Sequence, residues 1–162
     1  MVAAVIVAAG RGTRMGPGVD KLFLEVAGRP VVAHTWARWD AAPGVDEIVL
    51  VVRAGMEDAF AELAESLGLR RPWRLAPGGA ERQDSVWNGL AAVSPGVEIV
   101  AVHDGARPAV AAGLIADTLA AARAAGAAVA AQRVTDTLKE SDGGTRSLRT
   151  VDRGRLWAVQ TP

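Results

Sequence analysis

The chain has 162 residues, of which 50% are hydrophobic and 22% are charged, a composition typical of one globular domain with a buried core. Its formal net charge is zero, so the sequence gives no reason to expect binding to nucleic acid or to an anionic membrane. The absence of cysteine excludes disulfides and thiolate chemistry, and two histidines are too few for a zinc site built from histidine. Because no apolar stretch has the length of a membrane span, we expect a soluble cytoplasmic protein.

Apolar, β-branched runs alternate with helical patterns along the first 132 residues. The runs at 3–8, 47–52 and 98–103 predict strands, and their unbroken apolar character is typical of strands covered on both faces. The run at 127–132 predicts a further strand. Four stripes at helical spacing lie between them: Val32, Trp36 and Trp39; Met56, Phe60, Leu63 and Leu67; Val86, Leu90 and Val93; and Leu114, Ile115, Thr118, Leu119 and Ala122. Gly68 and Gly126 are placed to end the second and fourth helices. This order predicts an α/β fold with a mainly parallel central sheet.

The pattern changes after about position 133. Residues 139–147 are polar and rich in turn formers, and a Gly-Gly pair lies between two short runs that could pair as strands. The sequence therefore predicts a projecting β-arm at about 134–153. No linker separates it from the rest, so we expect a single domain over 1–162.

The stretch VAAGRGTRMGPGVDK (7–21) follows the first predicted strand directly. Gly10 and Gly12 allow a tight turn whose backbone N–H groups can bind phosphate oxygens. Arg14 adds a planar fork for the same anions, and Lys21 adds a mobile point charge. These residues favour a loop that wraps a nucleoside triphosphate, although a solvated turn with ordinary charges remains an alternative.

A dinucleotide site is a further interpretation of the same glycines. Gly10, Gly12 and Gly16 are spaced one residue wider than the usual fingerprint. A dinucleotide site also needs an acidic residue that closes the second strand, and Arg53 stands there instead. This interpretation gives no role to Arg14 and Lys21.

Several blocks together resemble one enzyme family. AAGRGTRMG followed by DK is similar to the signature loop of sugar-phosphate and polyol-phosphate nucleotidylyltransferases. The blocks that follow have the order seen in the 2-C-methyl-D-erythritol 4-phosphate cytidylyltransferase family: GGAERQDSVWNGL (78–90), VHDGARP (102–108), TDTLK (135–139), TVDRGRLW (150–157) and QTP (160–162). The resemblance runs from Val5 to Pro162. It implies a Rossmann-like nucleotidyltransferase fold, a three-layer sandwich with a projecting β-arm.

The resemblance also implies a reaction and a nucleotide site. In the family, a phosphate oxygen of 2-C-methyl-D-erythritol 4-phosphate attacks the α-phosphorus of CTP and pyrophosphate leaves, so the protein contributes positioning and charge neutralisation. Arg14 and Lys21 match two catalytic cations of the family. The residues implied at the nucleotide are Ala8, Ala9, Gly10, Gly12, Gly79, Ser85 and Asp104. Ser85 could instead only satisfy local backbone groups, and Ala80 replaces an acidic residue that the family usually carries.

Asp104 follows a predicted buried strand, where a carboxylate can hold a hard cation on phosphates. On the residues alone, capping of the next turn is an equal alternative. The resemblance implies that Asp104 binds Mg²⁺ or another divalent cation. We expect Arg107 to brace this loop or to form a structural salt bridge, and His103 to pack or orient rather than to catalyse.

The arm is implied to hold the second substrate. Thr137, Arg153 and Thr161 match family residues that hold the polyol phosphate, and Arg153 can also align that phosphate for attack. In the family the arm reaches across a homodimer, so a homodimer is expected here. A solvated hairpin with ordinary charges is the alternative.

Family members continue past the QTP block, with a segment that completes the sheet and supplies an aspartate and a lysine. We therefore expect the C-terminal part of the domain to be missing from the sequence. A longer chain, a fusion to another pathway enzyme and a non-catalytic fragment all remain open. The nearest alternative function is a ribitol-5-phosphate cytidylyltransferase, followed by a nicotinamide-dependent oxidoreductase.

Overall fold

The computed structural model describes residues 1–10, 12, 20–141, 143 and 148–160. Two predicted site residues, Arg14 and Thr161, lie outside the described residues. The chain divides into two compact units, 1–128 and 129–161, and each is described by itself.

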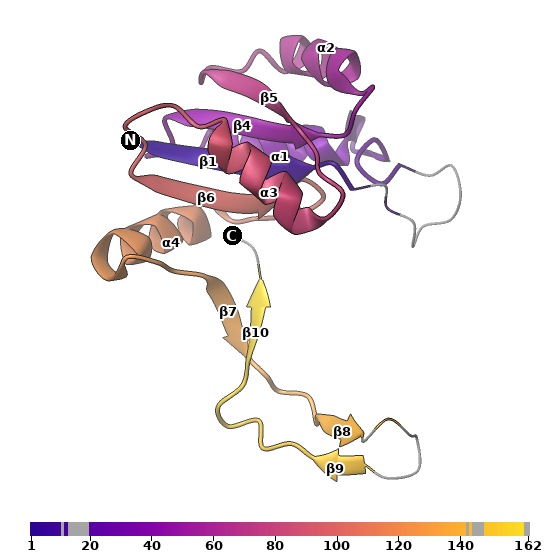
Figure 1. Cartoon of the computed structure of the whole chain (residues 1–162), viewed down its shortest axis with the longest axis vertical. Coiled ribbons are helices and arrows are strands. Elements are labelled where there is room, and N and C mark those ends of the chain that lie inside the picture. Colours follow the sequence, from indigo (N-terminus) through magenta and orange to yellow (C-terminus); the bar gives the residue numbers. More distant parts are fainter. Residues whose placement is uncertain (11, 13–19, 142, 144–147, 161–162) are drawn as a thin grey trace. The chain divides into compact units, whose positions relative to one another are not determined.

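The first unit contains a parallel four-stranded sheet with the strand order β5-β4-β1-β6 (Figure 1). Its strands are β1 (Val2–Ala8), β4 (Glu47–Val52), β5 (Trp73–Pro77) and β6 (Ile99–Asp104). Three of them confirm the predicted strands. The sequence analysis did not predict β5, because this edge strand is only partly buried and Arg74 interrupts its apolar run. The parallel pairing confirms the predicted α/β class.

Helices connect these strands at the predicted places. They are α1 (Val31–Asp40), α2 (Glu57–Leu67), α3 (Arg82–Ala91) and α4 (Ala112–Ala125). Gly68 and Gly126 follow α2 and α4 with φ of 57° and 85°, which confirms both predicted stops. A short hairpin of β2 (Glu25–Val26) and β3 (Arg29–Pro30) precedes α1 and was not predicted. No helix within the described parts of the chain is long and apolar enough to span a membrane.

The core has two layers because successive residues of β1 point to opposite faces of the sheet. Ala4 and Ile6 belong to the larger cluster, which is filled by α1, α2 and α4 through Trp36, Trp39, Phe60, Ile115 and Leu119. Val5 belongs to the smaller cluster on the opposite face, which α3 covers. Helix α3 packs so closely that a Cβ on Gly89 would lie 2.4 Å from Val5 Cγ1. The first unit is therefore a three-layer α/β/α sandwich.

The second unit consists of two antiparallel two-stranded sheets. Strand β7 (Ala130–Arg133) pairs with β10 (Trp157–Gln160), and β8 (Lys139–Ser141) pairs with β9 (Leu148–Thr150). The β8–β9 pair is the predicted hairpin. The predicted strand at 127–132 corresponds to β7, and its partner is β10, close to the end of the sequence. The arm therefore comprises more of the chain than residues 134–153.

Candidate active site

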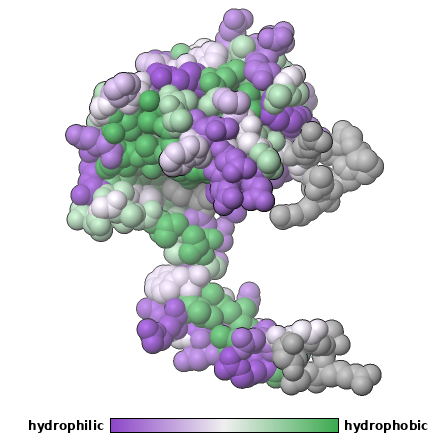
Figure 2. Space-filling model, viewed as in Figure 1, coloured by the Kyte–Doolittle hydropathy of each residue, from purple (hydrophilic) through white to green (hydrophobic). Residues whose placement is uncertain are grey.

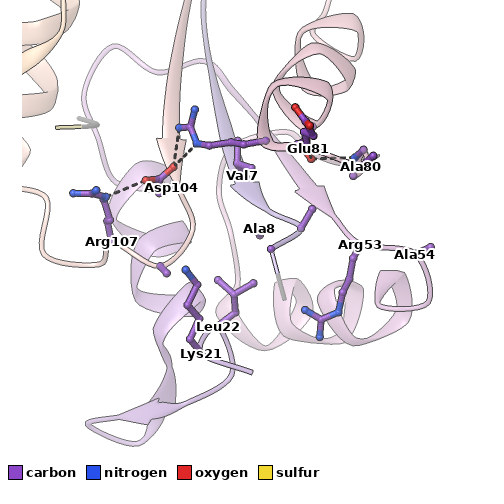
Figure 3. A pocket seen from close by; sticks show the side chains of 17 residues that line it. Val7, Ala8, Lys21, Leu22, Arg53, Ala54, Ala80, Glu81, Asp104 and Arg107 are labelled. Atoms are coloured by element: carbon purple, nitrogen blue, oxygen red, sulfur yellow. Dashed lines mark hydrogen bonds and ion pairs between the residues drawn. The ribbon is translucent and has the colours of Figure 1, made fainter. Parts of the chain in front are cut away.

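A cavity of about 900 Å³ lies at the carboxyl ends of the parallel strands (Figure 3). Its walls come from the end of β1, the residues after β4, the β5–α3 connection and the loop after β6, together with Lys21 and Leu22. After β5 the chain crosses back to place β6 on the other side of β1, so the strand order reverses between β1 and β6. Open α/β sheets bind ligands at such a reversal. The cavity is therefore the candidate active site of the first unit.

Most of the predicted nucleotide residues line this cavity. They are Ala8, Ala9, Gly10, Gly79, Ser85 and Asp104, and Lys21, predicted as a catalytic cation, lines it as well. Gly12 does not line it, but Gly12 has a left-handed φ of 63° and lies against the stem of Lys21. Thr137 and Arg153 belong to the second unit, which is described by itself below. The fold thus collects residues from four separate sequence blocks at one place.

Two glycines allow neighbouring loops to approach the end of β1. A Cβ on Gly78 would lie 2.4 Å from the Cβ of Ala9, and a Cβ on Gly105 would lie 3.1 Å from the Cβ of Ala8. Both loops are also hydrogen-bonded, since Gly78 N–H donates to Val52 O at 2.7 Å and Gly105 N–H donates to Val7 O at 2.9 Å. The backbone of both loops therefore packs directly against Ala8 and Ala9 at the end of β1.

Asp104 ends β6 and accepts hydrogen bonds from two arginines. Arg82 donates to Oδ1 from Nη2 at 2.8 Å and from Nε at 3.2 Å, and Arg107 Nε donates to Oδ2 at 3.0 Å. Burial by itself raises the pKa of Asp104, but the hydrogen bonds and charges of Arg82 and Arg107 outweigh burial and hold this pKa below its usual range. Asp104 is therefore ionised at neutral pH. The salt bridge expected for Arg107 is confirmed.

His103 lies beneath this loop and is almost fully buried. Its Nε2 lies 3.0 Å from the carbonyl oxygen of Arg107, and its ring packs against Trp39 with a centroid distance of 5.3 Å. Burial lowers the pKa of His103, and the hydrogen bond to Arg107 and the charge of Asp104 only partly oppose this. The neutral imidazole thus holds the loop, in agreement with the expectation that His103 packs and orients.

Ser85 makes local hydrogen bonds at the opposite wall. Its Oγ accepts from Gly79 N–H at 3.0 Å and donates to Glu81 O at 3.2 Å. The single hydroxyl proton is therefore already donated to Glu81 O. Toward a ligand, Oγ could only accept a hydrogen bond, at its remaining lone pair. A Cβ on Gly79 would lie 2.2 Å from the Cβ of Asp84, so this turn also requires glycine.

The cavity is also lined by two arginines that were not predicted as site residues. Arg82 lies in the first turn of α3, inside a quoted block, and Arg53 follows β4. Arg53 occupies the position after the second predicted strand, where a dinucleotide site would need a free carboxylate. Its side chain forms an ion pair with Asp20. Arg53 could have been predicted as a site residue because it is a charged residue directly after a buried strand. Together with Lys21 and Arg107, these side chains give the cavity four cationic groups among its described residues.

In the second unit, two predicted substrate residues lie beside each other. Arg153 Nη1 donates to Thr137 Oγ1 at 3.5 Å, and both residues are exposed. The backbone hydrogen bond from Val151 N–H to Leu138 O, at 3.0 Å, brings their segments together.

Asp104 is a carboxylate of the cavity that could hold a divalent cation on bound phosphates. Within the described ranges, no group of three or more His, Asp or Glu side chains is arranged to hold a metal. Mg²⁺ is commonly bound by one or two carboxylates together with substrate phosphates and water. Ionised Asp104 therefore fits such a site with one hard oxygen ligand, provided that one of its oxygens exchanges a guanidinium contact for the cation.

Known proteins share both this sequence and this fold. A model of the 2-C-methyl-D-erythritol 4-phosphate cytidylyltransferase family matches residues 2–162. A 2-C-methyl-D-erythritol 4-phosphate cytidylyltransferase of Pelotomaculum thermopropionicum is 48% identical over 162 residues, which cover 99% of this chain and 68% of the relative.

Two crystal structures are similar to this chain. The 4-diphosphocytidyl-2C-methyl-D-erythritol synthase of Anaerococcus prevotii has a TM-score of 0.85 and 32% identity, over 99% of this chain and 68% of that one. The 2-C-methyl-D-erythritol 4-phosphate cytidylyltransferase of Thermus thermophilus has a TM-score of 0.74 and 35% identity, over 100% of this chain and 69% of that one. The chain thus spans about two thirds of the length of these proteins.

The sandwich, the glycine-bounded cavity at the strand ends and the similar structures define an α/β nucleotidyltransferase. The chain belongs to the 2-C-methyl-D-erythritol 4-phosphate cytidylyltransferase family.

Proposed function

We propose that the cavity of the first unit binds CTP and that the chain transfers its cytidylyl group to 2-C-methyl-D-erythritol 4-phosphate, with release of pyrophosphate. Family membership gives this overall reaction. The observation that carries the assignment to the cavity is the meeting of the glycine-rich end of β1 with Lys21, Arg53, Arg82 and Arg107. A triphosphate needs such an excess of donors and cations in one place.

Lys21 and the backbone after β1 are proposed to hold the triphosphate. Figure 3 shows the Lys21 side chain directed toward the side of the pocket that carries Asp104 and Arg107. Cations at that side would neutralise charge that grows on the leaving pyrophosphate. Arg14 is proposed as a second such cation on the strength of the family resemblance. Gly79 and Ser85 at the opposite wall are proposed to face the base and ribose.

Asp104 is proposed to bind Mg²⁺ together with the phosphates. The bound cation would supply neutralisation of phosphate charge and fix the triphosphate geometry. Arg82 and Arg107 hold the carboxylate in place before any ligand arrives. They also keep it ionised, which is the form that binds a cation.

The arm is proposed to bind the acceptor phosphate through Arg153 and Thr137, with Thr161 as a further ligand, and to form a homodimer. A pair of two-stranded sheets is a marginal structure by itself. The arm also exposes large apolar side chains, with Leu148 55%, Trp157 51% and Val159 61% exposed. Figure 2 shows hydrophobic residues between hydrophilic ones on the visible face of the arm. Burial of these side chains against a second copy of the chain would stabilise the arms of both copies.

Pyrophosphate release tests this function. The chain, Mg²⁺ and CTP would be mixed with 2-C-methyl-D-erythritol 4-phosphate or with ribitol 5-phosphate, and the two initial rates compared. We expect the methylerythritol compound to be the far better acceptor, whereas a preference for ribitol phosphate would overturn the substrate. Tight NAD(P) binding that CTP does not displace would favour an oxidoreductase, and no binding of either nucleotide would favour a non-catalytic role.

A further inference from the structure

Asp20 and Arg53 join the glycine-rich region to the central sheet. Arg53 directly follows β4, and its Nη2 donates to Asp20 Oδ2. The two side chains are only 26% and 22% exposed, so solvent weakens this ion pair less than it would a surface pair. The backbone of Arg53 is fixed as well, since its carbonyl accepts from Met56 N–H at 3.2 Å. Asp20 is thus tied to a rigid element.

The turn that begins at Asp20 fixes the backbone on both sides of Lys21. Asp20 Oδ1 accepts from Leu22 N–H at 3.1 Å, and the Asp20 carbonyl accepts from Phe23 N–H at 3.1 Å. Leu22 is buried in the larger core cluster, and its carbonyl accepts from Val32 N–H at 3.0 Å. One carboxylate therefore connects Arg53 to the turn that carries Lys21.

The stem of Lys21 is confined from a third side. A Cβ on Gly12 would lie 3.1 Å from Lys21 Cγ and 3.4 Å from its Cδ, so the glycine backbone packs along the stem. Lys21 and Arg53, which are linked through Asp20, both line the cavity (Figure 3). A long, flexible lysine that is fixed before the ligand binds loses less entropy on binding.

The second terminal nitrogen of the Arg53 guanidinium, Nη1, does not hydrogen-bond to Asp20. It is buried and has no hydrogen-bond partner among the residues that the structure describes. The guanidinium is therefore held by Asp20 on one side only. The contact with Asp20 is therefore the side-chain interaction that holds the guanidinium among the described residues.

We propose that Arg53 is a positioning residue of the nucleotide site, which acts through Asp20 to fix Lys21 toward the triphosphate. Arg53 makes no contact with the reacting atoms in this assignment. The positioning itself is a property of the free protein, whereas its effect on CTP rests on the proposed function. Loss of either partner of the ion pair frees the turn, and Lys21 then samples orientations that do not face the ligand.

Lysine-selective NMR tests the positioning without any nucleotide. The chain has only two lysines, Lys21 and Lys139, so protein labelled at the lysine ε-carbon gives two methylene signals. Lys21→Ala assigns them. Lys139 is the internal reference, because it lies in the arm and its Nζ donates to Thr150 Oγ1 at 2.6 Å. We expect separate ε-proton resonances for Lys21 in the wild type, which merge in both Arg53→Gln and Asp20→Asn.

Arg70→Gln is the matched control. It removes an arginine–aspartate contact of the same unit, Arg70 Nε to Asp40 Oδ2 at 3.5 Å, away from the cavity. The control should leave both lysine signals as they are. An unchanged Lys21 signal in Arg53→Gln and Asp20→Asn, with the protein folded by circular dichroism, overturns the proposal whether or not CTP binds.

Calorimetry with CTP and Mg²⁺ tests the consequence for binding. We expect Arg53→Gln to raise Kd about tenfold in the wild-type background, and by roughly twofold or less when Lys21 is already alanine. Arg53→Lys keeps the charge but lacks the Nη2 group that donates to Asp20, so it should bind as weakly as Arg53→Gln. Equal effects in both backgrounds, or full rescue by Arg53→Lys, would show that Arg53 acts by its own charge. Failure of the wild type to bind CTP would instead count against the proposed function.

Discussion

The imidazole of His103 donates from Nε2 to the carbonyl oxygen of Arg107, at 3.0 Å, because a carbonyl can only accept. The other ring nitrogen, Nδ1, is buried and unbonded within the described parts of the chain. The histidine is therefore neutral, with its proton on Nε2. This contact, together with the hydrogen bond from Gly105 N–H to Val7 O, fixes the loop that presents Asp104 and Arg107 to the cavity.

Acid should destabilise the metal-free protein through His103. Its pKa in the folded protein lies below the ordinary value of 6.5, because burial disfavours the charged form. The unfolded chain therefore binds more protons in the pH range between the folded pKa and 6.5. The contribution to stability is complete above this range, and it is lost as pH falls, by at most ~1.4 kcal/mol per pH unit.

Urea unfolding between pH 5 and 8 measures this loss. In His103→Gln the amide can still donate to Arg107 O but does not titrate, so the slope of the unfolding free energy against pH should decrease. An identical slope in the variant and the wild type would show that His103 does not titrate with unfolding.

Lys21→Ala should lower turnover by ~10²–10³ without loss of fold, because it removes one cation that stabilises transition-state charge. Steady-state pyrophosphate release and thermal melting would be measured together. Arg38→Ala, an exposed charge in the last turn of α1, is the control and should leave turnover unchanged. Arg14→Ala is expected to behave as Lys21→Ala does; near-normal kinetics for both would remove the assignment of the glycine-rich loop.

Asp104→Asn should raise the Mg²⁺ concentration that activity requires and lower turnover by ~10² or more, since an amide is a poor ligand for a hard cation. The substitution also removes the negative charge that lies between Arg82 and Arg107. Titration of activity with Mg²⁺ distinguishes the two effects. If saturating Mg²⁺ supports wild-type turnover in the variant, Asp104 is not the ligand.

Ser85→Ala should lower the free energy of unfolding by about 1–3 kcal/mol, because Gly79 N–H then loses its acceptor in a partly buried turn. The local hydrogen bonds predict only a small change in the Kd for CTP. Chemical denaturation and calorimetry measure both quantities on the same samples. A large loss of CTP affinity at unchanged stability would instead assign Ser85 to direct contact with the nucleotide.

Arg153→Ala should raise the KM for the acceptor phosphate much more than that for CTP, because a guanidinium fork on the acceptor is lost. Thr137→Val should have a smaller effect in the same direction, since its hydroxyl contacts Arg153 at 3.5 Å. The two KM values from initial rates provide the measurement. A defect confined to CTP would contradict the role of Arg153 in the arm.

The sequence by itself determined the order of the four helices and of three central strands in the first unit, and part of the cavity wall. Unbroken apolar runs of this length are typical of buried strands, and a glycine-rich turn directly after one is expected at the carboxyl end of the sheet. For this reason Gly10 and Asp104 could be predicted to come together, whereas Gly79 follows the unpredicted strand β5 and was assigned by the family resemblance alone. The edge strand β5 escaped prediction because Arg74 makes its pattern resemble a loop.

Only the tertiary structure decided which side chains serve one another. Arg53 and Asp20 are 33 positions apart, and Arg82 and Asp104 are 22 apart, so no local pattern could pair them. The same holds for Ser85, whose hydroxyl could serve a ligand or the backbone until its hydrogen bonds to Gly79 and Glu81 were seen. The spacing of apolar residues predicts burial for each residue separately. An ion pair instead depends on where the packed sheet and helices place two residues that are distant in the sequence.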